Sequence, residues 1–533
     1  MSDRNGAGCL ARRIGGMLLA LLLAVSLSGD SGEVAPGTRI VAIRIVEHDV
    51  FDLDQPGTST WPYRWANALH VMTKERFIRS LLLFAVGDAV DPARLAETER
   101  TLRDTGFLSP VDITARPVPG GAEIVVETHD QWTTEVGFSY GRFGGQQHAG
   151  FSLAEQNLLG WGKTVILDLD SNPERTKRTV IYKDPLLLGS RWQLEAAHVN
   201  ATDGSADSFG VQYPFFALAT PRAAGLAWSR GDQHEWLWAS GDKVIEGEIR
   251  TASFQLWGGI RLPSDGDATD RLRLGIFADR ASYSNWRVLA GGGAPTPDSR
   301  DLRGILVGFE QQVDRWRVVR GFRAWQRQED VALGPNWTAQ VGVSLPAFGG
   351  DRGRIALAGD VNAAWLRGAQ LTWADLSLSG RAEGGGLANT VTHVEVGTAR
   401  PGDIGWRARL AADVGHDLDL DQQLALGADT GLRGWDPMTF DGTSRAVANL
   451  EWRHRLTGEV LHLGIIGLTV FGDAGQTWAP RVGPATDGIR KDAGVGLLIE
   501  STRAAILRVI RLEVAFPDRG GKPLFLATST SLF

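Results

Sequence analysis

The chain is poor in cysteine, in positive charge and in long apolar runs. Its 533 residues include one cysteine, Cys9, so a disulfide scaffold is excluded. A formal net charge of -7 argues against the concentrated basic face of a nucleic-acid-binding protein. After the N-terminus, no stretch reaches the roughly 18 consecutive apolar residues of a membrane-spanning helix. Glycine is abundant: the chain has 66, where an average share of roughly 7% would give about 37.

The N-terminus has the pattern of a secretory signal. Arg4, Arg12 and Arg13 precede an apolar run at residues 17–27, and small residues follow it. A positive segment, about 11 apolar residues and a small-residue cleavage region predict a signal peptide over residues 1–28. The alternative is a buried N-terminal helix. An exported chain without a spanning helix is either soluble or a membrane-spanning β-barrel.

A small α+β domain is predicted over residues 38–130. The signals are a strand, a helix with one apolar face, a helix that begins at an Asp-Pro pair, and a hairpin. They lie at residues 40–46, 74–84, 91–102, 111–115 and 122–128. An aromatic-rich insertion at residues 61–68 separates the first strand from the first helix and has no counterpart in this pattern.

The remaining residues, 131–533, alternate between apolar and polar side chains in segments of about ten residues. In residues 406–414, for example, Leu410 and Val414 share a face opposite Arg407 and Arg409. A soluble sandwich also alternates. The export signal, tryptophans near strand ends and charged residues on the second face favour a barrel with a wet interior. At about 25 residues for each strand and its connections, this region predicts about 16 strands.

Several motifs in the chain carry a resemblance to a known family. Residues 84–88, 95–102 and 105–111 resemble a POTRA domain, a periplasmic module. Residues 154–163, the Leu-Arg-Gly-Trp segment at 432–435, and residues 471–475 and 494–497 resemble segments of the surface-antigen-type barrel that follows it. Together they resemble the BamA/TamA outer-membrane insertase superfamily. The resemblance implies an all-β transmembrane barrel, here of about 16 antiparallel strands, preceded by one POTRA domain in the periplasm.

The Leu-Arg-Gly-Trp segment is similar to the tip of the family's sixth extracellular loop, which folds back into the barrel. The site implied by the resemblance comprises Leu432, Arg433, Gly434 and Trp435. In the family the arginine meets acidic residues of the inner wall, and alternation turns Glu451 and Asp473 inward here. A guanidinium can bind one carboxylate bidentately and reach a second. The alternative is a solvated arginine that meets neither acid.

Function and partners follow from the same resemblance. The implied function is insertion or translocation of other proteins at the cell outer membrane. The implied partners are unfolded outer-membrane or secreted client proteins, outer-membrane lipid, and periplasmic or lipoprotein partners. The alternatives are a passive pore of the same fold and a structural partner of an envelope complex. Phe533, the last residue, matches the terminal aromatic that is read as a sorting signal.

Signals for an enzyme are weak. The ten histidines are scattered without a His-x-x-x-His pair, so no metal site is predicted. A Gly-Asp-Ser-Gly segment at residues 29–32 falls in the signal cleavage region and has no supporting domain. We therefore expect no catalytic residues and no cofactor. The energy for insertion or translocation would then come from folding of the client protein.

Overall fold

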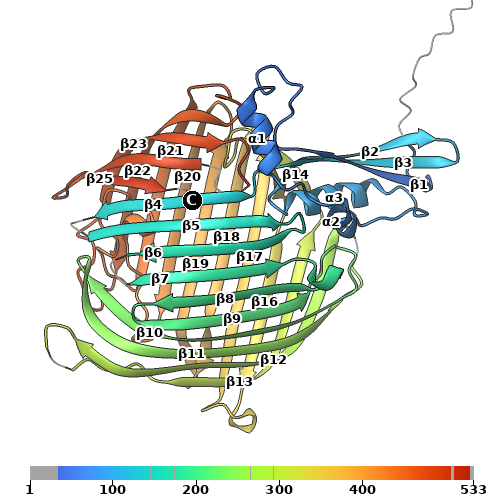
Figure 1. Ribbon diagram of the computed structural model, residues 1–533. Coiled ribbons are helices and arrows are strands. Elements are labelled where there is room, and N and C mark those ends of the chain that lie inside the picture. Colours follow the sequence, from blue (N-terminus) through green and yellow to red (C-terminus); the bar gives the residue numbers. More distant parts are fainter. Residues whose placement is uncertain are drawn as a thin grey trace, which may run out of the picture.

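The structure is a computed structural model that describes residues 34–143, 146–172, 175–264, 266–291, 293–505 and 509–528. An α+β domain lies at one end of a large barrel of strands (Figure 1). We call that end of the barrel the domain end and the opposite end the far end. The predicted signal peptide, residues 1–28, and Phe533 lie outside the described residues.

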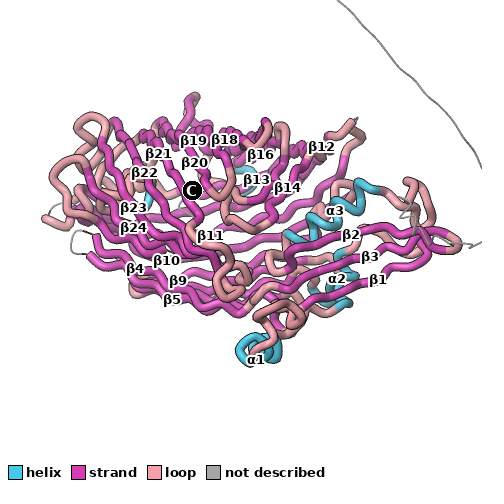
Figure 2. The backbone as a smooth tube through the Cα atoms, turned by 90° about the horizontal axis from the view of Figure 1, so that it is seen from above, coloured by secondary structure: helices cyan, strands magenta, loops and turns pink. Residues whose placement is uncertain are grey.

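The α+β domain is a three-stranded sheet covered by helices on one face (Figure 2). Its elements are β1 (Ile40–His48), α1 (Trp61–Leu69), α2 (Glu75–Leu81), α3 (Pro92–Arg103), β2 (Leu108–Val118) and β3 (Gly121–Asp130). The strand order is β1-β3-β2, with β1 parallel and β2 antiparallel to β3. Helix α1 occupies the aromatic-rich insertion.

The domain core forms where the apolar faces of α2 and α3 meet the sheet. Phe77 and Ile78 of α2 and Leu102 of α3 are buried against Ile40 and Ile124 of the sheet. At the start of α3, the Asp91 side chain accepts hydrogen bonds from the first helical N–H groups, as an N-cap residue does.

The remaining described residues form a closed antiparallel barrel of 20 strands. The strands are β4 (Thr134–Phe143), β5 (Gln146–Leu158), β6 (Lys163–Ser171), β7 (Thr176–Asp184), β8 (Gln193–Ala201), β9 (Gly204–Tyr213), β10 (Arg222–Ala239), β11 (Asp242–Arg261), β12 (Ala268–Val288), β13 (Arg300–Val313), β16 (Asn336–Ser344), β17 (Arg354–Arg367), β18 (Gln370–Glu383), β19 (Gly386–Arg400), β20 (Ile404–His416), β21 (Ser444–Arg455), β22 (Gly464–Trp478), β23 (Arg490–Ser501), β24 (Val509–Pro517) and β25 (Leu524–Thr528). Three short 3₁₀ helices, η1 (Leu187–Gly189), η2 (Pro346–Phe348) and η3 (Ala428–Thr430), lie in connections between them. Strand β25 closes the barrel on β4, with Phe525 opposite Arg142.

The predicted count of about 16 strands is therefore wrong. Strands β4 to β25 of the barrel occupy residues 134–528, so a strand with its connection takes about 20 residues rather than about 25. The connections are shorter than assumed: two residues join β8 to β9, β10 to β11, β17 to β18 and β18 to β19. Tight hairpins of this kind leave room for four more strands in the same length of chain.

The two faces of the barrel wall differ in character. Side chains that point outward are apolar and exposed, among them Leu274, Ile276, Leu410, Val414 and Leu450, each more than half exposed. Their neighbours along the same strands point inward and include paired charges, such as Arg271 of β12 with Glu310 of β13. None of the helices in the described residues is long and apolar enough to cross a membrane.

Two further segments fold into the barrel. Residues 314–335 leave β13 at the domain end and form a hairpin of β14 (Trp316–Arg320) and β15 (Gln328–Ala332); we call them the lumen hairpin. At the far end, residues 417–443 connect β20 to β21 and enter the barrel; we call them the inner loop.

Candidate functional site

The inner loop is a packed structure with its own hydrogen bonds. The backbone groups of Leu426 and Phe440 bond each other in both directions, at 2.9 and 3.0 Å. Leu426 and Leu432 are fully buried and pack against Val447 of the β21 wall. This arrangement fixes the segment before Arg433 and brings the Arg433 side chain to the inner wall.

Arg433 is fully buried among acidic side chains of the inner wall. Its Nε and Nη2 donate to the two carboxylate oxygens of Asp473 at 2.8 and 2.9 Å. Its Nη1 donates to Glu451 at 3.2 Å and to Glu513 at 3.5 Å. The guanidinium also lies 3.5 Å from the centre of the Phe471 ring. The structure thus places Arg433 against both acids that alternation turned inward, with a bidentate contact to Asp473.

The acids around Arg433 are shared with two further arginines. Arg511 Nη2 bonds Glu451 at 2.5 Å and Glu513 at 2.7 Å, and Arg453 pairs with Glu451. We call this set the arginine–carboxylate cluster, which comprises Arg433, Arg453, Arg511, Glu451, Asp473 and Glu513. The cluster pairs three cations with three anions, which matters because an unpaired buried charge would be costly. A further buried carboxyl, that of Asp492 on β23, lies opposite Asp473.

Strand register explains why the acids converge. Glu451 of β21 lies opposite Phe471 of β22, and Asp473 two residues further on points to the same inner face. Arg511 and Glu513 were not predicted as residues of this site; they alternate with Leu512 and Val514 along β24. The alternation would have shown that both point inward, but not that the inner loop reaches them.

Gly434 and Trp435 complete the tip of the inner loop. A Cβ atom on Gly434 would lie 2.5 Å from Cβ of Asp492 and 3.1 Å from the backbone nitrogen of Pro517. The glycine is therefore required for close approach to the wall. Trp435 Nε1 donates to the Lys491 carbonyl at 3.3 Å, and its ring meets that of Phe440 edge-on. Both contacts hold the tip against β23 and against the loop itself.

The lumen hairpin crosses the barrel near the domain end. Its Phe322 ring packs edge-on against Trp373 of β18, with centroids 5.5 Å apart. The backbone N–H groups of Trp325 and Gln326 donate to Glu500 of β23, at 2.5 and 3.1 Å. The hairpin starts between β13 and β16, so its tip reaches strands far around the barrel wall.

Two buried polar contacts are among those that tie the α+β domain to the barrel. Arg103 of α3 binds Asp330 of the lumen hairpin. Asp130 of β3 accepts hydrogen bonds from the N–H and hydroxyl of Thr73, at 2.7 and 2.9 Å. The Thr73 hydroxyl in turn accepts one from Asn157, at the end of β5, at 2.8 Å.

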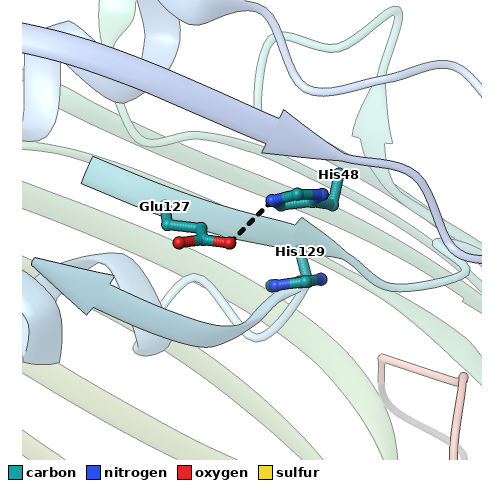
Figure 3. A group of neighbouring side chains, drawn as sticks. All are labelled: His48, Glu127 and His129. Atoms are coloured by element: carbon teal, nitrogen blue, oxygen red, sulfur yellow. Dashed lines mark hydrogen bonds and ion pairs between the residues drawn. The ribbon is translucent and has the colours of Figure 1, made fainter. Parts of the chain in front are cut away.

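Three side chains of the α+β domain offer metal-binding atoms close together (Figure 3). Strand pairing brings His48 of β1 opposite His129 of β3, with Glu127 two residues before His129. His48 Nε2 lies 2.8 Å from Glu127, and the two rings stack with centroids 4.3 Å apart and planes within 11°. Imidazole lone pairs lie in the ring plane, so two stacked, nearly parallel rings do not aim at one point. The group is an ion pair beside a ring stack, and one ring would have to rotate before a metal could bind.

No metal site was predicted because the histidines form no His-x-x-x-His pair, and His48 and Glu127 are 79 residues apart. Only the parallel pairing of β1 with β3 brings them together. The two strands are separated in the sequence by both helices of the domain core, so their pairing could not be predicted from residue spacing along the chain.

A closed barrel with an apolar outer wall and paired charges inside is the architecture of membrane-spanning β-barrels. The inner loop enters the barrel and brings Arg433 to the inner wall, as the resemblance implied. Its position among the connections between strands differs. It is the eighth connection at the far end, not the sixth, and five strands follow it. In a 16-stranded barrel five strands also follow the sixth such connection, so the additional strands precede the loop.

No protein-family model and no curated protein sequence matches the chain. Solved structures similar to it include BamA from Haemophilus ducreyi lacking POTRA domains 1–3, at 13% identity and a TM-score of 0.39, covering 92% of this chain and 84% of that one. CdiB from Acinetobacter baumannii is 9% identical with a TM-score of 0.44, over 92% and 74% of the two chains. CdiB from Escherichia coli is 12% identical with a TM-score of 0.44, over 92% and 76%. Likeness of this degree adds no argument on function.

Proposed function

We propose that this chain is an outer-membrane protein that inserts or translocates other proteins. The barrel spans the membrane, and the α+β domain is a POTRA domain in the periplasm. The observation that carries the proposal is that packed segments enter the lumen from both ends: the lumen hairpin at the domain end and the inner loop at the far end. A passive pore needs a clear path, whereas a protein-handling barrel needs moving parts that close it between clients.

The apolar outer wall supports the membrane placement. Exposed leucine, isoleucine and valine side chains recur on the outward face of many barrel strands. Contiguous apolar surface of that extent is unfavourable in water and is matched by the hydrocarbon of a bilayer. A closed barrel also satisfies its backbone polar groups internally, as lipid requires.

A client segment would first bind at the sheet edge of the α+β domain by β-augmentation. Strand β3 is central, so β1 and β2 each have an outer side. On β2, α3 covers that side, where Arg103 donates to the Val111 carbonyl and Glu99 accepts from the Ile113 N–H. Strand β1 has no proline, so all of its residues keep their backbone N–H groups. The Ile43 carbonyl lies on its outer side, where it accepts a hydrogen bond from the Arg79 side chain. We propose β1 as the docking edge.

The client would then pass to the barrel seam, where β25 meets β4. Among the described residues, the pairing runs from Phe525 opposite Arg142 to Ala527 opposite Tyr140. Separation of these strands would expose two edges that can template client strands, and folding of the client would supply the energy.

Reconstitution separates the proposal from a passive pore. The full chain in liposomes should speed the membrane folding of an added, urea-unfolded β-barrel client relative to empty liposomes. Single-channel recordings of the same preparation in planar bilayers should show a mostly closed state. A steadily open channel without any effect on client folding would support the pore.

A variant of the docking edge tests the binding step. Ile45 has the same parity along β1 as Ile43, so its N–H faces the outer side, and Ile45→Pro would remove that donor without breaking the ladder to β3. We expect slower client folding from Ile45→Pro, and wild-type rates from Ile45→Ala and from the matched Ala115→Pro on β2. Equal slowing by all three variants would contradict β1 as the edge.

A further inference from the structure

Helix α1 presents its apolar side chains outward. Trp61, Trp65 and Leu69 recur every four residues, so they lie along one face of the helix. They are 77%, 63% and 55% exposed. None of the residues of α1 is buried. An ordinary surface helix turns its apolar face to the core and its polar face to water, so α1 is inverted.

The opposite face of α1 holds the helix in place. The amide of Asn67 and the backbone of Phe51 bond each other in both directions, at 2.8 and 3.2 Å. The Tyr63 hydroxyl donates to the Leu461 carbonyl, in the turn between β21 and β22, at 2.8 Å. The orientation of the tryptophan face is therefore fixed by contacts to both the domain and the barrel.

The neighbouring barrel rim is apolar as well. In the turn between β21 and β22, Val460, Leu461 and Leu463 are 42%, 69% and 48% exposed. The same turn leads directly into Ile466 on the outer wall of β22, which is also exposed. In Figure 1, α1 lies at the domain end of the barrel, and in Figure 2 it protrudes sideways beyond the strands. The exposed apolar residues of α1 and those of this rim thus lie on neighbouring parts of the molecule, joined by the contact of Tyr63 with Leu461.

Positive charge lies close to this face. Arg64 is exposed on α1, and the segment that follows the helix carries Lys74, Arg76 and Arg79 against a single acid, Glu75. Lys74 also stands over the ring of Trp161, in the turn between β5 and β6, at 4.3 Å. Tryptophan beside basic residues is the composition of segments that lie at the boundary of headgroups and acyl chains.

We infer that α1 is an interfacial membrane helix whose tryptophan face inserts into the lipid headgroup region of the membrane that the barrel spans. Such helices bury their apolar face about 5–10 Å into the headgroup and acyl boundary. The contact would fix the angle of the α+β domain to the membrane and hold the β1 edge beside the barrel. The inference rests on the membrane placement proposed above.

Site-specific quenching tests the inference. The full chain in a Cys9→Ser background is labelled with an environment-sensitive fluorophore at Trp65→Cys, and placed in vesicles of phosphatidylethanolamine and phosphatidylglycerol that contain brominated lipid. Matched positions are Ile276→Cys on the outer wall and Arg116→Cys on β2. Bromine placed high on the acyl chain should quench the label at position 65 severalfold more than the label at position 116.

The outcomes separate the two proposals. Quenching at position 276 without quenching at position 65 overturns the role of α1 and leaves the membrane placement standing. Absence of quenching at both positions overturns the membrane placement itself. A further label, at Leu69→Cys, is compared with and without the substitutions Trp61→Ser and Trp65→Ser. Without the two tryptophans, the label at position 69 should lose most of its quenching. The label at position 276 should keep its own, which controls for folding. Unchanged quenching at position 69 would show that the tryptophans do not hold the helix in lipid.

Discussion

Arg103 of α3 binds Asp330 of the lumen hairpin through two parallel hydrogen bonds, Nε to Oδ2 at 2.7 Å and Nη2 to Oδ1 at 2.8 Å. Both side chains are less than 10% exposed. The contact joins the α+β domain to a segment that crosses the barrel. A movement of the domain that broke the pair would therefore loosen the lumen hairpin. Under the proposed function, this would give client binding outside the barrel a route to its interior.

Arg103→Ala should open the lumen at the domain end. Removal of one partner of a buried pair typically costs about 3–5 kcal/mol, because the other charge stays behind without compensation. Asp330 would be drawn toward water, and the lumen hairpin with it. In planar bilayers we expect more frequent and longer channel openings than in the wild type.

Arg94→Ala is the matched control, since Arg94 lies on the same helix but is 44% exposed and 3.8 Å from its partner Asp88. An exposed pair of this kind is worth about 0–1 kcal/mol, so its channel record should resemble the wild type. The same record from Arg103→Ala would mean that the hairpin is held by its other contacts alone.

Phe533 is expected to act in assembly rather than in export. In the family that the chain resembles, a terminal aromatic is read as a sorting signal, and aromatic residues anchor such barrels at both membrane interfaces. Deletion of Phe533 should leave secretion intact and reduce the amount of folded barrel, measured as the fraction that shifts on a detergent gel between unheated and boiled samples. Wild-type amounts of the heat-modifiable form would show that this residue carries no signal.

Some parts of the site could be predicted from sequence because they depend only on alternation. The inward direction of Glu451 and Asp473 follows from the apolar residues on either side of each, which is local information. The additional partners of Arg433 could not be found in this way, because they depend on how far the inner loop extends into the barrel. Arg511 and Glu513 lie about 80 residues beyond Arg433 in the chain, on a strand that the loop meets only after folding.

The fold was predictable in kind but not in number. Period-two alternation predicted strands correctly, because a barrel wall has a lipid-like outside and a polar inside. The count of 16 was wrong because alternation does not reveal how short a connection is. The lumen hairpin was also missed. Its strands β14 and β15 pair only with each other among the described strands, and nothing in residues 314–335 distinguishes them from wall strands.

Arg433→Ala should release the inner loop. The substitution would leave Asp473 without its bidentate partner and Glu451 and Glu513 with one cation fewer. A buried network of this kind loses about 3–5 kcal/mol when one member is removed. We expect slower client folding and faster cleavage of residues 417–443 by protease added from outside. Arg433→Lys should restore only part of the protection, because an ammonium group cannot bind a carboxylate in the bidentate way.

A double-mutant cycle of Arg433→Ala with Asp473→Ala measures the contact itself. Coupling of about 1 kcal/mol or more in loop protection is expected for groups in direct contact. Arg519→Ala serves as the control because Arg519 is 63% exposed at the same end of the barrel and should not couple with Asp473. Additive effects of the Arg433 and Asp473 substitutions would place the anchoring of the loop in Leu432 and Trp435 instead.

The stability of the α+β domain should fall as pH rises, through Asp130. Burial raises the pKa of the Asp130 carboxyl to about 6, from an ordinary value of 3.8. The folded domain therefore keeps this proton over a range in which the unfolded chain has released it. The stabilisation that comes from this proton is complete below the pKa of the unfolded chain. It is lost as pH rises through the pKa of the folded domain, and the free energy of unfolding falls by about 1 kcal/mol between about pH 5 and about pH 7.5.

Other titratable groups face Asp130, so the prediction concerns a difference between two proteins. His70 Nε2 lies 3.7 Å from the carboxylate, and Asp49 lies on the other side of that histidine. Burial and the nearby Asp130 also raise the pKa of Glu47, whereas burial lowers the pKa of His129, which changes the stability in the opposite direction.

Asp130→Asn keeps an acceptor for Thr73 and removes only the titration. Unfolding of the domain in the full chain, followed by pulse proteolysis in urea, should show a flatter pH profile for Asp130→Asn than for the wild type. Parallel profiles would mean that Asp130 is ionised in the folded domain throughout this range, and that the hydrogen bonds from Thr73 outweigh its burial.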